Sequence, residues 1–124
     1  MRLLPDTHAL LWLVADDQRL TRRADALLAD PRNEVLLSAA VAWEAAIKRS
    51  LGRLRVPDGF AETILGRGAT PLPITIAHSE AVSSLPWHHR DPFDRMLVAQ
   101  ASLEDAVIVS GDNRLAEYEV RVEW

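Results

Sequence analysis

The stretch DPFDRMLVAQASLEDAVIVSGD, residues 91–112, contains a complete helix–strand unit and decides how the chain is organised. Asp91 followed by Pro92 favours a helix start, because aspartate accepts bonds from free backbone N–H groups and proline fits the first turn. The apolar spacing predicts that this helix runs from residue 91 to residue 104. The run AVIVS, residues 106–110, predicts a buried strand, and Asp112 follows it by two residues.

Short apolar runs alternate with helical patterns along the rest of the chain. Strands are predicted at 2–5 and 34–38, a strand or an extended stretch between prolines at 72–76, and a last strand at the sheet edge at 120–122. Helices are predicted at 7–15, 21–29, 39–51, 57–65, 78–85 and, as a short piece, 113–117. Strands that alternate with helices imply βαβ units, so an α/β fold with a mostly parallel central sheet is expected.

Composition narrows the class of protein. The chain has 124 residues, 48% of them hydrophobic, so one domain spanning residues 1–124 is expected. It has no cysteine, which excludes thiolate zinc sites and thiol catalysis and fits a cytoplasmic location. No apolar run is long enough to span a membrane. The net charge of −4 argues against nucleic-acid binding through bulk positive charge, but it leaves room for a local basic rim.

Four acidic side chains fall where ligands bind in such sheets. Asp6 directly follows the first predicted strand and Asp112 follows the strand at 106–110, so both are expected at the carboxyl edge. Glu44 lies within the apolar helix segment VAWEAAI, and Asp94 lies in the first turn of the helix that starts at Asp91. The sequence therefore predicts a cluster of carboxylates at one edge of the sheet.

Each of these acids also has an ordinary structural explanation. Asp6 could cap the helix that follows it, Asp94 could stabilise its helix through the dipole, and Asp112 is a common turn residue. Glu44 and Lys48 are four residues apart and could form a pair along the helix. Taken singly the acids are ordinary, but strand-end acids together with a glutamate in an apolar helix are less so.

A metal ion would reconcile the four carboxylates. Placed in one pocket, they repel one another unless a counter-charge is present. Oxygen ligands without cysteine suit Mg²⁺ or Mn²⁺, which bind a few carboxylates together with substrate phosphate. Such an ion activates water and offsets charge on a leaving oxygen, so phosphoester hydrolysis is the predicted chemistry.

The chain resembles the PIN-domain family, and most of all its VapC-type toxins, in LLPDTHALLW, SAAVAWEAAIKRSLGRL, LPITIAHSEAVSSLPWHHRDPFDRMLVAQA and VSGDNRLAEYEV. The resemblance covers nearly the whole chain in order and spacing. It implies a three-layer α/β/α fold and a metal-dependent ribonuclease, with Mg²⁺ or Mn²⁺ as cofactor. The implied catalytic and metal-binding residues are Asp6, Glu44, Asp94 and Asp112. The implied partners are RNA as substrate, a VapB-type antitoxin and a second copy of the chain in a homodimer.

Further positions follow from the resemblance. Ser110 matches a hydroxyl position near the family's metal site, and Thr7 is expected to orient Asp6 by hydrogen bonding. Pro5 departs from the family pattern, because proline removes a ladder donor just before Asp6. The four histidines, His8, His78, His88 and His89, are interpreted as structural or rim residues.

Two surface features are also predicted. A basic rim would bring phosphates to the acidic centre. Its members are Arg49, Arg53, Arg55, Arg90, Arg95 and Arg114. The first helix carries Trp12 within the apolar run LLWLV, which indicates either a partner surface or a helix buried on two sides.

Other classes of protein share parts of this pattern. A haloacid-dehalogenase-like phosphatase, which also uses Mg²⁺, would need an acid two residues after Asp6, where His8 stands. A response-regulator receiver would need a lysine near its last strands, and no lysine follows Lys48. A catalytically inactive PIN-like binding module would not need four intact carboxylates.

Overall fold

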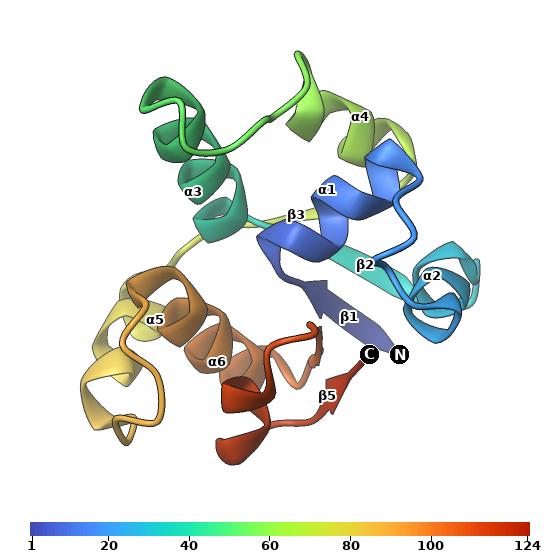
Figure 1. The fold of residues 1–124 in the computed structure, drawn as a ribbon. Coiled ribbons are helices and arrows are strands. Elements are labelled where there is room, and N and C mark those ends of the chain that lie inside the picture. Colours follow the sequence, from blue (N-terminus) through green and yellow to red (C-terminus); the bar gives the residue numbers. More distant parts are fainter.

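A five-stranded sheet forms the centre of the computed structural model, which describes residues 1–124 (Figure 1). All neighbouring strands are parallel, in the order β3-β2-β1-β4-β5. The strands are β1 (Arg2–Pro5), β2 (Glu34–Ser38), β3 (Thr70–Leu72), β4 (Val107–Val109) and β5 (Val122–Glu123). The predicted parallel sheet and the edge position of the last strand are both confirmed.

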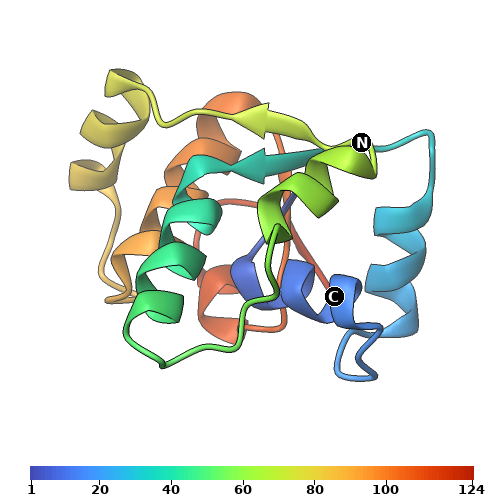
Figure 2. The ribbon, with the colours of Figure 1, turned by 90° about the horizontal axis from the view of Figure 1, so that it is seen from above.

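Six α-helices connect and cover these strands. They are α1 (Thr7–Ala15), α2 (Arg22–Ala29), α3 (Ala39–Ser50), α4 (Phe60–Gly66), α5 (Ile76–Ala81) and α6 (Pro92–Glu104). Two 3₁₀ helices, η1 (Val82–Ser84) and η2 (Asn113–Glu117), follow α5 and β4. Figure 2 shows α2 and α5 at opposite ends of the molecule. No helix is long and apolar enough to cross a membrane.

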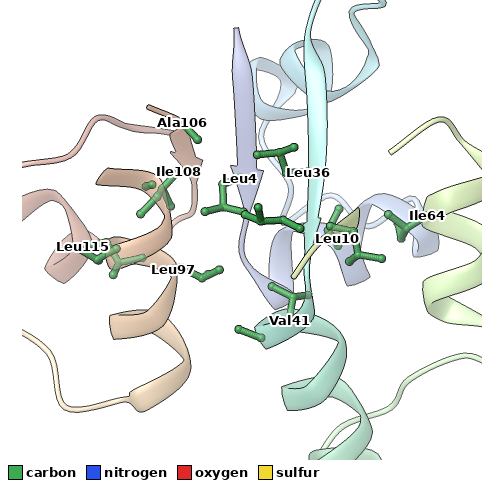
Figure 3. Close-up of a cluster of buried hydrophobic side chains, with 14 of the residues drawn as sticks. Leu4, Leu10, Leu36, Val41, Ile64, Leu97, Ala106, Ile108 and Leu115 are labelled. Carbon is green, nitrogen blue, oxygen red and sulfur yellow. The ribbon is translucent and has the colours of Figure 1, made fainter. Parts of the chain in front are cut away.

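The two faces of the sheet are buried in separate apolar clusters. Leu4 of β1 and Ile108 of β4 point into the larger cluster, together with side chains of α3, α4 and α6 (Figure 3). Leu3 and Val109, their neighbours along the same strands, point into a smaller cluster that α2 covers. Alternate residues of a strand face opposite sides of its sheet, so β1 and β4 are buried on both faces. This arrangement confirms the three-layer α/β/α prediction.

Helix α1 lies between these two clusters. Leu10 and Leu11 pack into the larger one and Ala9 into the smaller one, while Trp12 is half-buried against the smaller one. The apolar run of α1 is therefore explained by burial on two sides, and a partner surface on this helix stays a prediction. The most exposed large apolar side chains, Ile76 and Trp87, lie elsewhere.

Three predicted elements are shifted along the chain. The strand or extended stretch expected at 72–76 is a strand at Thr70–Leu72, paired with Leu36–Ser38 of β2. Pro73 has no N–H for a further ladder bond. The helix expected from residue 78 begins at Ile76, because Thr75 caps it by accepting a bond from the His78 backbone N–H. The helix expected from residue 57 likewise begins later, at Phe60.

Pro5 is accommodated at the end of β1. The residue after it continues the ladder, because the Asp6 backbone N–H donates to the carbonyl of Val109 at 3.0 Å. Pairing of β1 with β2 covers only Arg2 and Leu3, at the other end of the strand. Although Pro5 has no N–H to donate, the backbone of Asp6 is therefore still anchored to β4.

Candidate active site

The carboxyl ends of β1 and β4 meet in a cleft of about 580 Å³. Its lining includes all four predicted site acids, Asp6, Glu44, Asp94 and Asp112. Parallel strands bring the residues that follow them to one edge of a sheet, which accounts for two of the acids. The other two arrive on helices, Glu44 in the middle of α3 and Asp94 in the first turn of α6.

Asp6 has two structural partners that fix its carboxylate. One oxygen accepts the backbone N–H of Ala9 at 2.8 Å and caps α1, as expected. The other accepts the hydroxyl of Ser110 at 2.5 Å. The Ser110 oxygen in turn accepts the backbone N–H of Asp112 at 3.0 Å. The hydroxyl after β4 thus links the acid after β1 to the turn that carries Asp112.

Glu44 is buried and is held by two donors. The hydroxyl of Thr7 donates to one of its oxygens, and Lys48 pairs with the other at 2.6 Å. The expectation that Thr7 orients Asp6 was therefore wrong. Thr7 is the first residue of α1, which packs against α3, so its side chain reaches the neighbouring helix. The pair of Glu44 and Lys48 exists as predicted, but inside the cleft.

Asp91 and Asp94 divide two tasks at the start of α6. Asp91 caps the helix, accepting the backbone N–H groups of Phe93 at 2.8 Å and Asp94 at 3.1 Å. Asp94 is free of that task and directs its carboxylate at the other acids in the cleft, with a side chain 19% exposed. The predicted capping role of Asp91 is confirmed.

His89 also belongs to this cleft, which was not predicted from the sequence. Its ring is 4% exposed, and Nε2 lies 2.9 Å from Asp112 and 3.1 Å from Asp94. Nδ1 accepts the backbone N–H of Asp91 at 3.0 Å, so the proton of the neutral ring is on Nε2. His89 therefore donates to Asp112, and the same ring nitrogen lies beside the carboxylate of Asp94.

Arg95 fixes the loop that carries His89. Its guanidinium is buried and donates to the carbonyls of Pro86 at 2.9 Å and Val82 at 3.1 Å. The Tyr118 hydroxyl accepts the His89 backbone N–H at 3.0 Å. The assignment of Arg95 to a basic rim was wrong, because an arginine with 3% exposure cannot meet a substrate.

Two of the four acids form ion pairs with basic side chains, and the other two do not. Lys48 pairs with Glu44, and Arg114 lies 2.9 Å from Asp112. The Arg114 guanidinium holds the pKa of Asp112 well below its usual range. Asp6 and Asp94 form no ion pair with a lysine or arginine. They are the uncompensated members of the cluster.

The pKa values reflect this division. Burial raises the pKa of Asp94 to about 7, and the nearby charges of Asp91, Asp6, Glu44 and Asp112 add to the effect. Burial also raises the pKa of Asp6, although its hydrogen bonds from Ser110 and Ala9 oppose the shift. Both carboxylates would ionise more readily with a further positive charge in the cleft.

A hard divalent cation fits this donor set. Carboxylate oxygens are the ligands that Mg²⁺ and Mn²⁺ prefer, and two of those here lack a cationic partner. His89, Asp94 and Asp112 each offer one atom within 4.8 Å of the others. The Nε2 proton makes His89 a donor to Asp112, so the acids remain the metal-binding candidates.

Three comparisons relate this chain to known proteins. The profile of the family described as PIN domain matches residues 3–120. Ribonuclease VapC16 of Mycobacterium tuberculosis (strain ATCC 25618 / H37Rv) is 41% identical over 99 residues, which are 70% of this chain and 67% of that protein. One chain in the crystal structure of VapBC2 from Rickettsia felis, bound to a DNA fragment from their promoter, superposes with a TM-score of 0.74. That alignment covers 100% of this chain and 99% of the other at 12% identity, so it supports the fold alone.

Proposed function

The chain belongs to the PIN-domain family, and on that premise we propose that it is a metal-dependent endoribonuclease, the toxin of a VapBC-type toxin–antitoxin pair. One observation carries the proposal. Four carboxylates, from the end of β1, from α3, from α6 and from the turn after β4, line one cleft, and two of them pair with no lysine or arginine. The ribonuclease relative supports RNA as the substrate, and residues 1–124 would form one PIN domain.

We assign Asp6, Glu44, Asp94 and Asp112 as the residues that would hold Mg²⁺ or Mn²⁺. When bound, such an ion supplies an activated water and offsets charge on the leaving oxygen of the RNA phosphodiester. Three other side chains position these ligands. Ser110 holds Asp6, Thr7 holds Glu44, and His89 spans Asp94 and Asp112.

The alternatives are less well supported. A phosphatase with a strand-end aspartate nucleophile would use a second acid near Asp6, but Thr7 turns to Glu44 and His8 is exposed. An inactive binding module has no use for a carboxylate such as Asp94, whose pKa is raised by burial and by the neighbouring acids, because that burial and repulsion lower stability.

A homodimer and a VapB-type antitoxin are proposed as partners, with the cytoplasm as the place of action. The family supports both partners, and the antitoxin would silence cleavage by blocking the cleft. Two measurements test this: the mass of the protein in solution and its cleavage of RNA, each with and without the proposed antitoxin. A monomer whose cleavage is unchanged by that antitoxin would contradict it.

Sequencing of RNA 5′ ends after brief expression in cells would test the activity and identify the RNA that is cut. New ends should appear with the wild-type protein and be lost in Asp94→Asn. Asp105→Asn is a matched control, because Asp105 is an exposed helix cap with φ 51°, a backbone conformation that asparagine tolerates. New ends that persist in Asp94→Asn would contradict the assignment.

A further inference from the structure

The cleft has an aromatic part as well as an acidic part. Of the 14 residues that line it, only two are hydrophobic, and both are tryptophans, Trp12 of α1 and Trp124 after β5. Their ring centroids lie 5.8 Å apart, and the ring of His8 lies 5.5 Å from Trp12. These are ordinary separations for interacting aromatic rings. His8, Trp12 and Trp124 thus form one strip, here called the aromatic wall, which begins two residues after Asp6.

The backbone of the site fixes Trp124. A Cβ atom on Gly111 would lie 2.9 Å from Cε2 of the Trp124 ring, so the ring packs directly on the glycine backbone. Gly111 lies between Ser110, which binds Asp6, and Asp112. Because Gly111 is adjacent to Asp112 in the chain, this contact fixes the position of the Trp124 indole relative to the acids.

A charged group completes this end of the cleft. The guanidinium of Arg19 lies over the Trp12 ring, 4.9 Å from its centroid. Asp17 orients it with two bonds, at 2.8 and 3.1 Å. Arg19 is itself exposed and lines the cleft, so its outer side remains accessible to a phosphate.

Packing alone does not account for the aromatic wall. Trp12 and Trp124 contact the smaller apolar cluster, but both stay half-buried and line a cleft whose other members are polar. Partly exposed rings beside carboxylates and an arginine resemble the surfaces that bind single-stranded nucleic acid, where bases stack on aromatic side chains and cations contact the backbone.

We propose that Trp12 and Trp124 form a stacking subsite for one unpaired nucleobase of the RNA, next to the place where the scissile phosphate would meet the metal-binding acids. The inference rests on the proposed function and adds to it a binding position for one base beside the cut. Bases inside a duplex are covered on both faces by their neighbours, so only an unpaired or extruded base can stack on the wall. Stacking tolerates any base, because each base has a π face.

A second aromatic pair in this protein provides a control. Trp43 and Phe93 lie 5.3 Å apart, each one residue before a site acid, and Trp43 is 59% exposed. Neither lines the cleft. Replacement of Trp43 therefore removes an exposed indole of the same kind from outside the proposed subsite.

Binding of a fluorescein-labelled hexa-adenylate RNA would test the subsite. The parent carries Asp94→Asn, so that bound RNA is not cut. Trp12→Leu and Trp124→Leu should each raise Kd roughly tenfold, as expected for the loss of one base stack. Trp12→Phe and Trp124→Phe keep a ring and should stay within a few-fold of the parent. Trp43→Leu should leave Kd unchanged.

The decisive arm places one abasic residue at each position of the same RNA. One position should raise Kd roughly tenfold in the parent, and this penalty should vanish in the leucine variants. A penalty that stays equal in those variants would overturn the proposal, as would no penalty at any position. Disappearance of the penalty in Trp43→Leu would place the stack on the exposed pair and would also overturn it.

Folding and function are kept separate in this design. If a leucine variant does not fold, the parent and the phenylalanine variants still test the proposal. The rise in Kd caused by the abasic residue must be present in the parent and must remain when phenylalanine replaces tryptophan. Cleavage of cellular RNA by the wild-type protein is scored independently. Absence of cleavage would sink the proposed function, whereas cleavage without an abasic penalty would sink only the subsite.

Discussion

Two groups of polar side chains lie beside α6 and differ in how they are satisfied. At one end, Asp94 points into the cleft among like charges, and its pKa rises to about 7, mainly through burial. Further along the helix, Gln100 lies in a buried network. It accepts the Ser38 hydroxyl at 2.6 Å and donates to the Pro73 carbonyl at 3.3 Å. Nearby, the ring of His78 lies 3.1 Å from Glu104.

The polar groups of the Gln100 network all have partners, whereas the charges of the cleft do not. No buried side-chain N or O atom in the chain lacks a hydrogen-bond partner, so the network has no capacity left for a ligand. In the cleft the hydrogen bonds are also made, but negative charge remains uncompensated on Asp6 and Asp94. Satisfied polar groups specify the packing of a fold. Excess charge of one sign in a concave site favours a ligand of the opposite sign.

The largest effect should come from neutralising one acid of the cleft. Asp94→Asn keeps the size of the side chain and removes a charge that we assign to metal binding. Cleavage of RNA should fall by more than about 100-fold, because even groups that only support a metal ligand are worth 10–100-fold. Rates at saturating Mg²⁺ measure this, with Asp105→Asn as the control. Retention of full activity would show that Asp94 is not needed.

The same variant should alter how stability depends on pH in metal-free protein. A pKa raised in the folded state means that folded Asp94 keeps its proton where the unfolded chain has released it. Stability is therefore lost as pH rises from about 4 to about 7. Urea unfolding of the wild type should show a loss between pH 5 and pH 8 that exceeds the loss in Asp94→Asn. The difference should be on the order of 2 kcal/mol. Parallel profiles for the two proteins would show that the pKa of Asp94 is not raised in the folded state.

The network should respond in the opposite way. Gln100→Leu leaves the Ser38 hydroxyl and the Pro73 carbonyl without their partner and should lower the free energy of unfolding by about 1–2 kcal/mol. Cleavage per folded molecule should stay the same. Gln18→Leu, at an exposed glutamine, serves as the control and should change stability by less than about 0.5 kcal/mol. A Gln100→Leu protein that is as stable as the wild type but inactive would contradict the claim that the network serves folding and the cleft serves cleavage.

The smallest effect concerns the remaining arginines of the predicted rim. Arg53, Arg55 and Arg90 are exposed and form no ion pair, unlike Arg49, which pairs with Asp58, and Arg114, which pairs with Asp112. Replacing Arg53 and Arg55 by glutamine should weaken RNA binding slightly. It should also flatten the plot of log K against log salt by about 0.7 for each RNA phosphate that the protein no longer neutralises. An unchanged slope would show that these two arginines do not meet the RNA.

The parts of this fold set by local sequence could be predicted, and those set by packing could not. The buried run at 106–110 and the cap at Asp91 identify their elements directly, and the strand ends place Asp6 and Asp112. His89 and Arg95 could not be placed, because they depend on the loop after η1, where no hydrophobic period fixes the backbone. The partner of Thr7 was misassigned for a related reason, since it depends on how α1 packs against α3.

RNA cleavage in the presence and absence of a divalent cation tests the central claim most directly. The purified protein is freed of metal with chelator and then titrated with Mg²⁺ or Mn²⁺, with Asp94→Asn measured in parallel. The account predicts no cleavage in excess chelator, recovery of activity with either ion, and no recovery in the variant. Full cleavage by the wild-type protein in excess chelator would contradict it.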